Sequence, residues 1–247
     1  MARRTPEETQ QTREKLLDAA LEVFWEEGVA RPSLTKVAER AGMTRGAIYG
    51  HFKNKADVFN AICDRIFFPT DMLEQLREEG AEDPLGTLQE WVTTVLRRRF
   101  ADPQQRMFMD IIFLRCEAIG NDDVRERLRQ NAQQLRLHER ELMQRAIASG
   151  QLPADLNLDL ATLALGALLS GLLRSLSLLP PAVDAPGPWI EQLGKAATDL
   201  LHSEALRKRP GETPCEALFP EFYALEPSEP SDPSVRIRIT EGDIHST

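Results

Sequence analysis

The stretch Thr44-Arg-Gly-Ala-Ile-Tyr-Gly-His-Phe-Lys-Asn-Lys55 gathers cationic and ring-bearing side chains on one short predicted helix. Just before it, Ser33-Leu-Thr-Lys-Val-Ala-Glu-Arg-Ala-Gly-Met43 predicts a first short helix that ends in a turn at Gly42, so about four residues join the two helices. Ser33 and Thr44 stand where the N-caps of these helices belong. The pattern predicts a helix-turn-helix over residues 33–52, with a surface suited to phosphate.

The positive charge of the chain is concentrated in this region. The whole chain has a formal net charge of −9, whereas residues 31–55 carry six Lys or Arg against the single acid Glu39, a local charge of +5. A confined basic surface indicates one nucleic-acid-binding face rather than a generally basic coat. Because 247 residues exceed one small DNA-binding head, we expect a head and a larger second domain.

The rest of the sequence predicts an all-α protein, because no stretch shows the sustained alternation typical of strands. Apolar spacing predicts a helix over residues 9–27, stopped by Gly28, and another that follows an Asn54 cap and bends or ends at Pro69. Asp-Pro pairs at 83–84 and 102–103 each predict a helix start. Further helices are expected from about 121 to 150, from 156 to 179 and from 189 to 206, nine in total.

Several function classes are excluded by what the sequence lacks. Cys63, Cys116 and Cys215 are widely spaced and form no Cys-x-x-Cys pair, which favours reduced thiols and no metal site. His138 and His202 lack a second ligand at helical spacing. No nucleophile–base pair or glycine-rich phosphate loop is present, so we expect neither catalysis nor a cofactor. The N-terminus lacks an apolar signal segment, which predicts a cytoplasmic protein without a membrane span.

The composition changes near the C-terminus. From Pro210 onward the chain has six prolines and a charge of −6, from eight acids against Arg236 and Arg238. Such a composition buries too little apolar surface to fold alone. We therefore predict a mostly disordered tail over residues 208–247.

These motifs together resemble the TetR family of bacterial transcription regulators. The match is carried by Val37-Ala-x-x-Ala-Gly42 followed by Thr-Arg-Gly-Ala-Ile-Tyr-x-His-Phe-Lys-Asn-Lys. Similarity to the AcrR-like branch of multidrug-efflux repressors spans residues 1–207 and includes Arg3-Arg-Thr5, Thr12-Arg13, Gly28-Val-Ala-Arg31, Asp83-Pro-Leu-Gly86, Cys116-Glu117 and Gly150-Gln-Leu-Pro153. The resemblance implies a nine-helix fold, with a DNA-binding head over 1–66 and a ligand-binding and dimerisation domain over 67–207.

The resemblance also implies which residues contact DNA. Arg45, at the start of the second helix of the motif, is the expected base reader, because a guanidinium can bond guanine O6 and N7 together. Tyr49, His51 and Lys53 are expected at phosphates, although Tyr49 and His51 also suit packing. Ile48 and Phe52 are expected in the core. The full predicted DNA-binding set is Arg13, Ser33, Thr35, Thr44, Arg45, Gly46, Ala47, Tyr49, His51, Lys53 and Lys55.

Gly50 departs from the family pattern, in which a larger side chain is common at this position. A glycine inside a helix lowers stability by about 1 kcal/mol relative to alanine. We expect the fold to survive and the affinity or fit for the operator to change.

For the larger domain, the resemblance implies a hydrophobic pocket where sequence alone favours a solid core. Its lining is predicted from apolar residues at helical spacing, namely Leu88, Trp91, Val92, Val95, Met109, Phe113, Leu135, Leu169, Ser170 and Leu173. The last two helices are expected to form a homodimer through Gly166, Ser170, Gly171, Leu172, Leu176, Trp189, Leu193, Ala197 and Leu200, some of which also suit the monomer core.

The resulting hypothesis is a homodimeric repressor that binds a palindromic operator in double-stranded DNA and leaves it when a hydrophobic small molecule enters the body. The effect of ligand binding is expected to reach the head through the helix that follows the Asn54 cap. Two alternatives remain from sequence alone, a related regulator controlled by a protein partner and an all-α enzyme or ligand carrier.

Overall fold

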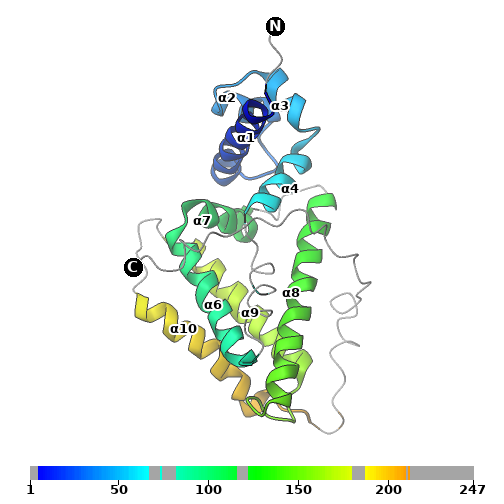
Figure 1. The fold of residues 1–247 in the computed structure, drawn as a ribbon, viewed down its shortest axis with the longest axis vertical. Helices are drawn as coiled ribbons and strands as arrows, with labels where there is room; N and C mark the ends of the chain where they lie inside the picture. Colours follow the sequence, from blue (N-terminus) through cyan, green and yellow to red (C-terminus); the bar gives the residue numbers. More distant parts are fainter. Residues whose placement is uncertain are drawn as a thin grey trace.

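A computed structural model describes residues 5–66, 73, 82–115, 122–179, 187–209 and 211. Within these residues the regular structure is helical, apart from one isolated antiparallel bridge between Leu156 and Arg207, and this confirms the all-α prediction. Figure 1 shows a small helical head above an elongated helical body. Pro69, Cys116, Cys215 and, apart from residue 211, the predicted tail from 210 onward lie outside the described residues.

The head consists of α1 (Pro6–Glu27), α2 (Leu34–Arg40), α3 (Arg45–His51) and α4 (Lys55–Arg65). Helix α1 begins three residues before the predicted start because Thr5 forms a capping box. The Thr5 hydroxyl accepts the Glu8 backbone N–H at 3.2 Å, and the Glu8 carboxylate accepts the Thr5 N–H at 3.0 Å. At the other end Gly28 takes a φ of 80°, which an L side chain rarely adopts.

One apolar core joins the head to the upper part of the body. Leu16, Phe24 and Phe59 of the head pack in the same buried cluster as Phe108 and Ile111 of the body. The rings of Phe59 and Phe108 have centroids 6.3 Å apart. The head therefore rests on the body through shared side-chain packing as well as through chain connectivity.

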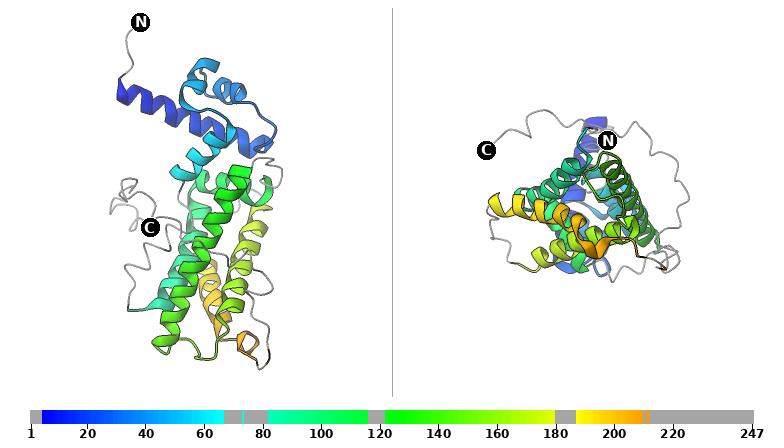
Figure 2. Two further views of the ribbon diagram at one scale, coloured as in Figure 1. Left: turned by 90° about the vertical axis from the view of Figure 1, so that its right-hand side faces the viewer. Right: turned by 90° about the horizontal axis from the view of Figure 1, so that it is seen from below.

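The body contains α6 (Pro84–Ala101), α7 (Pro103–Asp110), a π-helix (Ile111–Arg115), α8 (Asp122–Ala148), α9 (Leu158–Ser177) and α10 (Gly187–Asp199), followed by 3-10 turns at Leu200–His202 and Glu204–Leu206. The two predicted Asp-Pro starts are confirmed. Asp83 accepts the Gly86 N–H, and Asp102 accepts the N–H groups of Gln104 and Gln105. In Figure 2 α6, α8, α9 and α10 run along the body and enclose its second core.

Helix α10 approaches α6 closely at Gly194. A Cβ atom there would lie 2.1 Å from the Thr93 hydroxyl oxygen and 3.3 Å from the Gln89 carbonyl oxygen. Glycine is therefore required by space rather than by backbone conformation. This contact fixes the last helix against the interior of its own chain.

Candidate nucleic-acid interface

Helix α3 has one buried face and one exposed face. The packing of the buried face determines which way the exposed face points. Thr44 caps the helix by accepting the Ala47 N–H at 3.3 Å. Ile48 and, just beyond the helix, Phe52 are buried in the head core, which confirms the predicted packing role of both. Arg45 and Tyr49, on the opposite side, are exposed, and 48% of the Tyr49 surface is accessible. The head thus presents a polar surface on the side of α3 opposite its buried anchors.

Arg45 and Tyr49 form one unit on that surface. The guanidinium carbon of Arg45 lies 5.3 Å from the centroid of the Tyr49 ring, within range of a cation–π contact. Both side chains remain exposed in this contact. Gly46 is exposed beside them and Ala47 is half-buried, so the backbone at the start of α3 is open to a close approach.

The other predicted DNA contacts surround α3. Arg13 is half-buried, and its guanidinium lies 5.5 Å from the Phe52 ring centroid. Thr35 is half-buried and Lys53 exposed, while the Ser33 hydroxyl caps α2 by accepting the Lys36 N–H at 3.2 Å. The structure therefore gathers these side chains in the head, around the motif.

Two predicted contacts have structural partners within the protein. The Lys55 ammonium donates to the Ala30 carbonyl oxygen and so ties the start of α4 to the loop before α2. His51 is half-buried, with its ring centroid 6.2 Å from that of Phe52. Both residues therefore hold the motif together whatever else they contact.

Two of the six cations counted over residues 31–55 are paired with acids of α1. Arg40 bonds Glu26 at 2.5 Å and Glu22 at 3.2 Å, and Lys36 pairs with Glu27. The hydrogen bond from Arg40 lowers the pKa of Glu26, and that to Glu26 raises the pKa of Arg40. Sequence counting over residues 31–55 missed these pairs because their acids lie upstream on α1. Lys36 and Arg40 thus form ion pairs that hold α2 against α1 within the head.

Gly50 lies on the exposed side of α3, and a Cβ atom there would meet no atom within 4 Å. Its backbone is ordinary helix without a positive φ. Nothing in the described structure therefore requires glycine at this position.

A chain of polar contacts that no local sequence pattern predicted links the head to the body at the end of α1. The Trp25 indole donates to one Asp110 oxygen at 3.0 Å, and Arg99 donates to the other at 2.8 Å. Arg99 also donates to the Leu176 carbonyl near the end of α9, at 3.4 Å. Burial lowers the pKa of Arg99, and the Asp110 charge opposes that shift. Three body helices thus connect to the recognition head.

Helix α4, the predicted coupling element, is also held from both sides. Arg65 bonds Asp18 of α1 at 2.7 Å, and Asp64 accepts from Arg127 of α8 at 2.7 Å. The π-helix adds a further link, because Arg115 donates to the Glu26 carbonyl at the end of α1, at 3.1 Å. The partners in these contacts are 47 to 89 positions apart in the sequence, so no local pattern could predict them.

The predicted ligand-binding residues occupy the interior of the body with one exception. Ser170 is exposed, on the outer side of α9 from the buried Leu169 and Leu173, because adjacent helical positions lie about 100° apart. Its predicted place in the lining is therefore wrong. Met109 is buried in α7, and the rest belong to or pack against the second core, namely Leu88, Trp91, Val92, Val95, Phe113, Leu135, Leu169 and Leu173.

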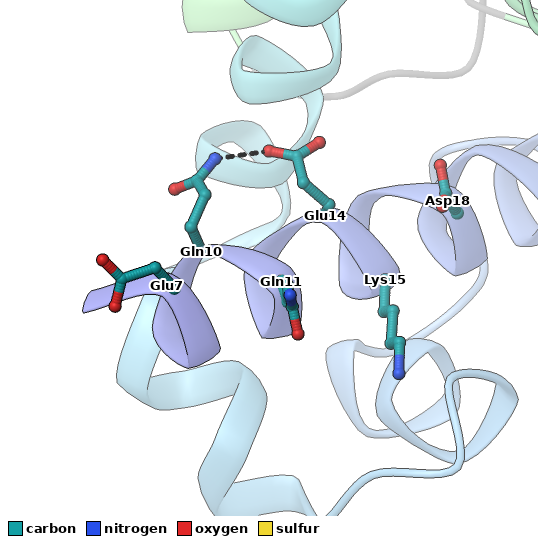
Figure 3. A pocket seen from close by; sticks show the side chains of 6 residues that line it. All are labelled: Glu7, Gln10, Gln11, Glu14, Lys15 and Asp18. Atoms are coloured by element: carbon teal, nitrogen blue, oxygen red, sulfur yellow. Dashed lines mark hydrogen bonds between the residues drawn. The ribbon is translucent and has the colours of Figure 1, made fainter. Parts of the chain in front are cut away.

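A surface hollow lies on the head instead, along α1. Figure 3 shows it lined by Glu7, Gln10, Gln11, Glu14, Lys15 and Asp18, with Gln10 bonded to Glu14 at 2.6 Å. Its side chains are polar, and three acids face one lysine. None of the predicted ligand-binding residues contributes to it. Across the described part of the chain, no group of three or more His, Cys, Asp or Glu could hold a metal ion.

The outer faces of α9 and α10 carry large exposed apolar side chains. Leu168 is 42% exposed, Leu178 beyond the end of α9 is 70% exposed, and Trp189 of α10 is 63% exposed. A Cβ atom at Gly166 or Gly171 would meet nothing within 4 Å. By length and composition α9 could cross a membrane, the only such helix among the described residues, and 28% of that stretch is buried.

Five of the residues predicted for the homodimer pack within their own chain, among them Leu172 and Leu176 of α9, which lie against the second core. Ala197 is buried, and Leu193 and Leu200 pack against the second core. The approach of α10 to α6 at Gly194 explains this placement, because it turns that face of α10 inward. Trp189 alone of the named α10 residues remains outside.

Comparison with known proteins agrees with this geometry. The family model described as "Bacterial regulatory proteins, tetR family" matches residues 16–62, and that of the "MAATS-type transcriptional repressor, C-terminal region" matches residues 83–185. The HTH-type transcriptional regulator TtgR of Pseudomonas putida is 38% identical over 214 residues, which cover 84% of this chain and all of TtgR.

Two solved structures share the fold. MexZ, a repressor from Pseudomonas aeruginosa, superposes with a TM-score of 0.67 at 31% identity, over 81% of this chain and 100% of MexZ. The complex of SmeT with triclosan gives 0.67 at 29% identity, over 83% and 96%; SmeT is a repressor of a Stenotrophomonas maltophilia efflux pump. The exposed α3 surface, the helical body and these matches lead to one conclusion: the chain belongs to the TetR family of bacterial transcription regulators and is not an enzyme.

Proposed function

We propose that the protein is a homodimeric repressor that binds a palindromic operator through two copies of the α3 surface. The observation that carries this proposal is the outward-facing pair of Arg45 and Tyr49, fixed on the buried anchors Ile48 and Phe52. Arg45 reads a guanine in the major groove, while Arg13, Thr44 and Lys53 hold phosphates on either side. A protein acting on DNA in this way works in the cytoplasm.

Dimerisation is supported by the exposed apolar face of α9. One head covers one half-site, so a two-fold operator needs two heads about 34 Å apart. Leu168, Gly171 and Leu178 offer apolar area and a close backbone approach, and a second copy of α9 would bury both. Such a contact also accounts for a helix that is apolar yet mostly unburied within one chain.

The regulated genes are those of a multidrug efflux system, and the signal is a hydrophobic small molecule bound in the body. The proposal follows the relatives, because SmeT represses an efflux pump and has been solved with triclosan. In this chain, ligand binding among α6 to α9 would act on the head through α4 and through the contacts of Asp110. A ligand shifts the equilibrium between the operator-binding and the released conformation only by the difference in its affinity for the two.

Substitution of Arg45 tests the operator contact. A bidentate guanine contact contributes about 1 to 3 kcal/mol per half-site, so Arg45→Ala should weaken operator binding by at least about tenfold in a mobility-shift assay. Genomic fragments selected by the purified protein supply the operator. Lys208→Ala is the matched control, since it removes an exposed charge next to Asp155, beyond the far end of α8. Equal shifts for Arg45→Ala and the wild type would refute the proposed base contact.

The ligand response is tested on the same complex. A panel of apolar drugs that includes triclosan should release the operator fragment and raise the melting temperature of the free protein. If no compound does either, control by a protein partner replaces the ligand in this proposal.

A further inference from the structure

Two polar bridges join the end of α1 in the head to the end of α9 in the body. In the first bridge, the Trp25 indole of α1 and the Arg99 guanidinium of α6 donate to the two carboxylate oxygens of Asp110, at 3.0 and 2.8 Å. Arg99 also donates to the Leu176 carbonyl oxygen of α9, at 3.4 Å. The first bridge therefore runs from α1 through the last residue of α7 and through α6 to α9.

The second bridge runs through the π-helix. Arg115, its last residue, donates to the Glu26 carbonyl oxygen of α1 at 3.1 Å. On the other side, the Phe113 carbonyl oxygen accepts from Arg174 of α9 at 2.6 Å. Such helices are rare and occur mostly as single turns, often at functional positions. This one connects α1 on one side with α9 on the other.

The segment 110–115, which both bridges cross, also lies where the two apolar cores meet. Ile111 is buried in the core that includes the head, and Phe113 packs against the core of the body. A close-packed interior transmits a displacement rather than absorbing it. A shift of this segment would therefore act on the end of α1 and on the end of α9 together.

Arg174 places the second bridge next to the surface of α9 proposed for the dimer. It is exposed, and Gly171 and Leu178 lie three positions before it and four after it, on the same side of the helix. A second copy that binds this side of α9 would therefore cover the residue that holds the π-helix.

We propose that the pairing of two copies through α9 fixes the end of α1, and with it the direction of the head, by means of the two bridges. Arg115 and Arg174 are then positioning residues for the DNA-binding head. The inference rests on the proposed homodimer and specifies how its interface acts on the head. Two half-sites lie at a fixed separation, so heads already held at that separation lose less freedom when they bind.

Hydrogen exchange of the full-length protein, measured by mass spectrometry, tests this coupling without an operator or an effector. Arg174→Ala alters α9, yet it should speed exchange of the amides over 23–28 at the end of α1 by about threefold or more. Arg115→Ala should do the same, and Arg115→Lys, which keeps a donor, should restore most of the protection. The double alanine variant should exchange no faster than Arg115→Ala, because both contacts act through one element.

The dimer is tested by the double variant Leu168→Glu and Leu178→Glu, which places two charges on the exposed apolar side of α9. Analytical ultracentrifugation should show a dimer for the wild type and a monomer for this variant. The monomer should show the same faster exchange over 23–28. A monomeric wild type, or a double variant that stays dimeric, would overturn the inference.

Arg129→Ala is the matched control, because this exposed arginine pairs at 2.6 Å with Glu126 of its own helix and should leave the exchange of α1 unchanged. Circular dichroism checks that each variant is folded. Unchanged exchange over 23–28 in Arg174→Ala or in the monomer would overturn the coupling, while the proposed operator contact would stand if Arg45→Ala still lost binding. Conversely, a wild type that selects no DNA would end the proposed function, and the exchange rates would still decide the coupling.

Discussion

The head and the body are both helical, yet they differ in where their polar side chains lie. Across the described residues, every buried polar or charged side chain lies between Thr87 and Thr198 in the body, whereas the buried core residues of α1 to α4 are all apolar. The head carries its ion pairs on its surface, as between Arg40 and Glu26. Buried polar groups need partners of matching geometry, so the packing of the body depends on specific pairs such as Arg99 with Asp110, whereas that of the head depends on apolar shape alone.

The largest effect is expected where the two regions meet. Asp110→Asn removes the negative charge opposite the buried Arg99, which leaves an uncompensated cation, and breaking such a pair costs about 3 to 5 kcal/mol. Chemical denaturation should show this loss of stability. Asp64→Asn, which breaks the exposed pair with Arg127 between the same two regions, should change stability by less than about 1 kcal/mol. Similar losses for both variants would show that burial does not distinguish the two contacts.

The next effect concerns the interior of the body and depends on pH. Because the pKa of Glu139 is about 8 in the folded protein against an ordinary value of 4.5, the folded state holds the proton more tightly, and stability falls as pH rises between these values. Glu139→Gln removes that slope. At pH 7 the variant should be more stable by about 3 kcal/mol, and near pH 4 the difference due to this ionisation should vanish.

Unfolding of both proteins by urea at pH 4, 6 and 7 measures this difference. The exposed Glu39→Gln variant should follow the wild-type curve throughout. Parallel curves for wild type and Glu139→Gln would mean that the buried acid keeps its ordinary pKa.

The smallest effect belongs to the surface of the head. Gly50→Ala should raise stability by about 1 kcal/mol, because alanine favours the helix and its Cβ meets no neighbour. Gly42→Ala is the matched control, since Gly42 has a φ of 66° that disfavours any side chain, and this variant should lose stability. Thermal unfolding would separate the two. A loss of stability in both variants would show that the free protein also requires glycine at position 50.

The sequence predicted the head better than the body for a physical reason. Caps at Ser33 and Thr44 and the buried anchors Ile48 and Phe52 are local signals within one motif, and the structure places them as expected. The start of α1 was missed because the capping role of Thr5 was overlooked. In the body, apolar spacing identified the interior helices, yet it could not tell which face of α10 turns inward.

Contacts between distant residues were beyond sequence analysis. Trp25 and Asp110 lie 85 positions apart, and no sequence motif around either residue predicts that they are in contact. Glu139 escaped notice because a glutamate in a charged helix such as α8 normally faces solvent. Ser170 was assigned to the interior for the converse reason, since α9 is apolar on most sides and its sequence does not show which side is covered.

The pairing of Lys36 and Arg40 with acids of α1 has a consequence for how the protein responds to ionic strength. A cation that is already neutralised within the protein releases no counterion from DNA when the complex forms. Operator binding should therefore weaken less steeply with added salt than the six basic residues of 31–55 suggest. Recognition then depends more on the fit of α3 in the groove than on bulk attraction, which favours discrimination between sequences over tight binding to any DNA.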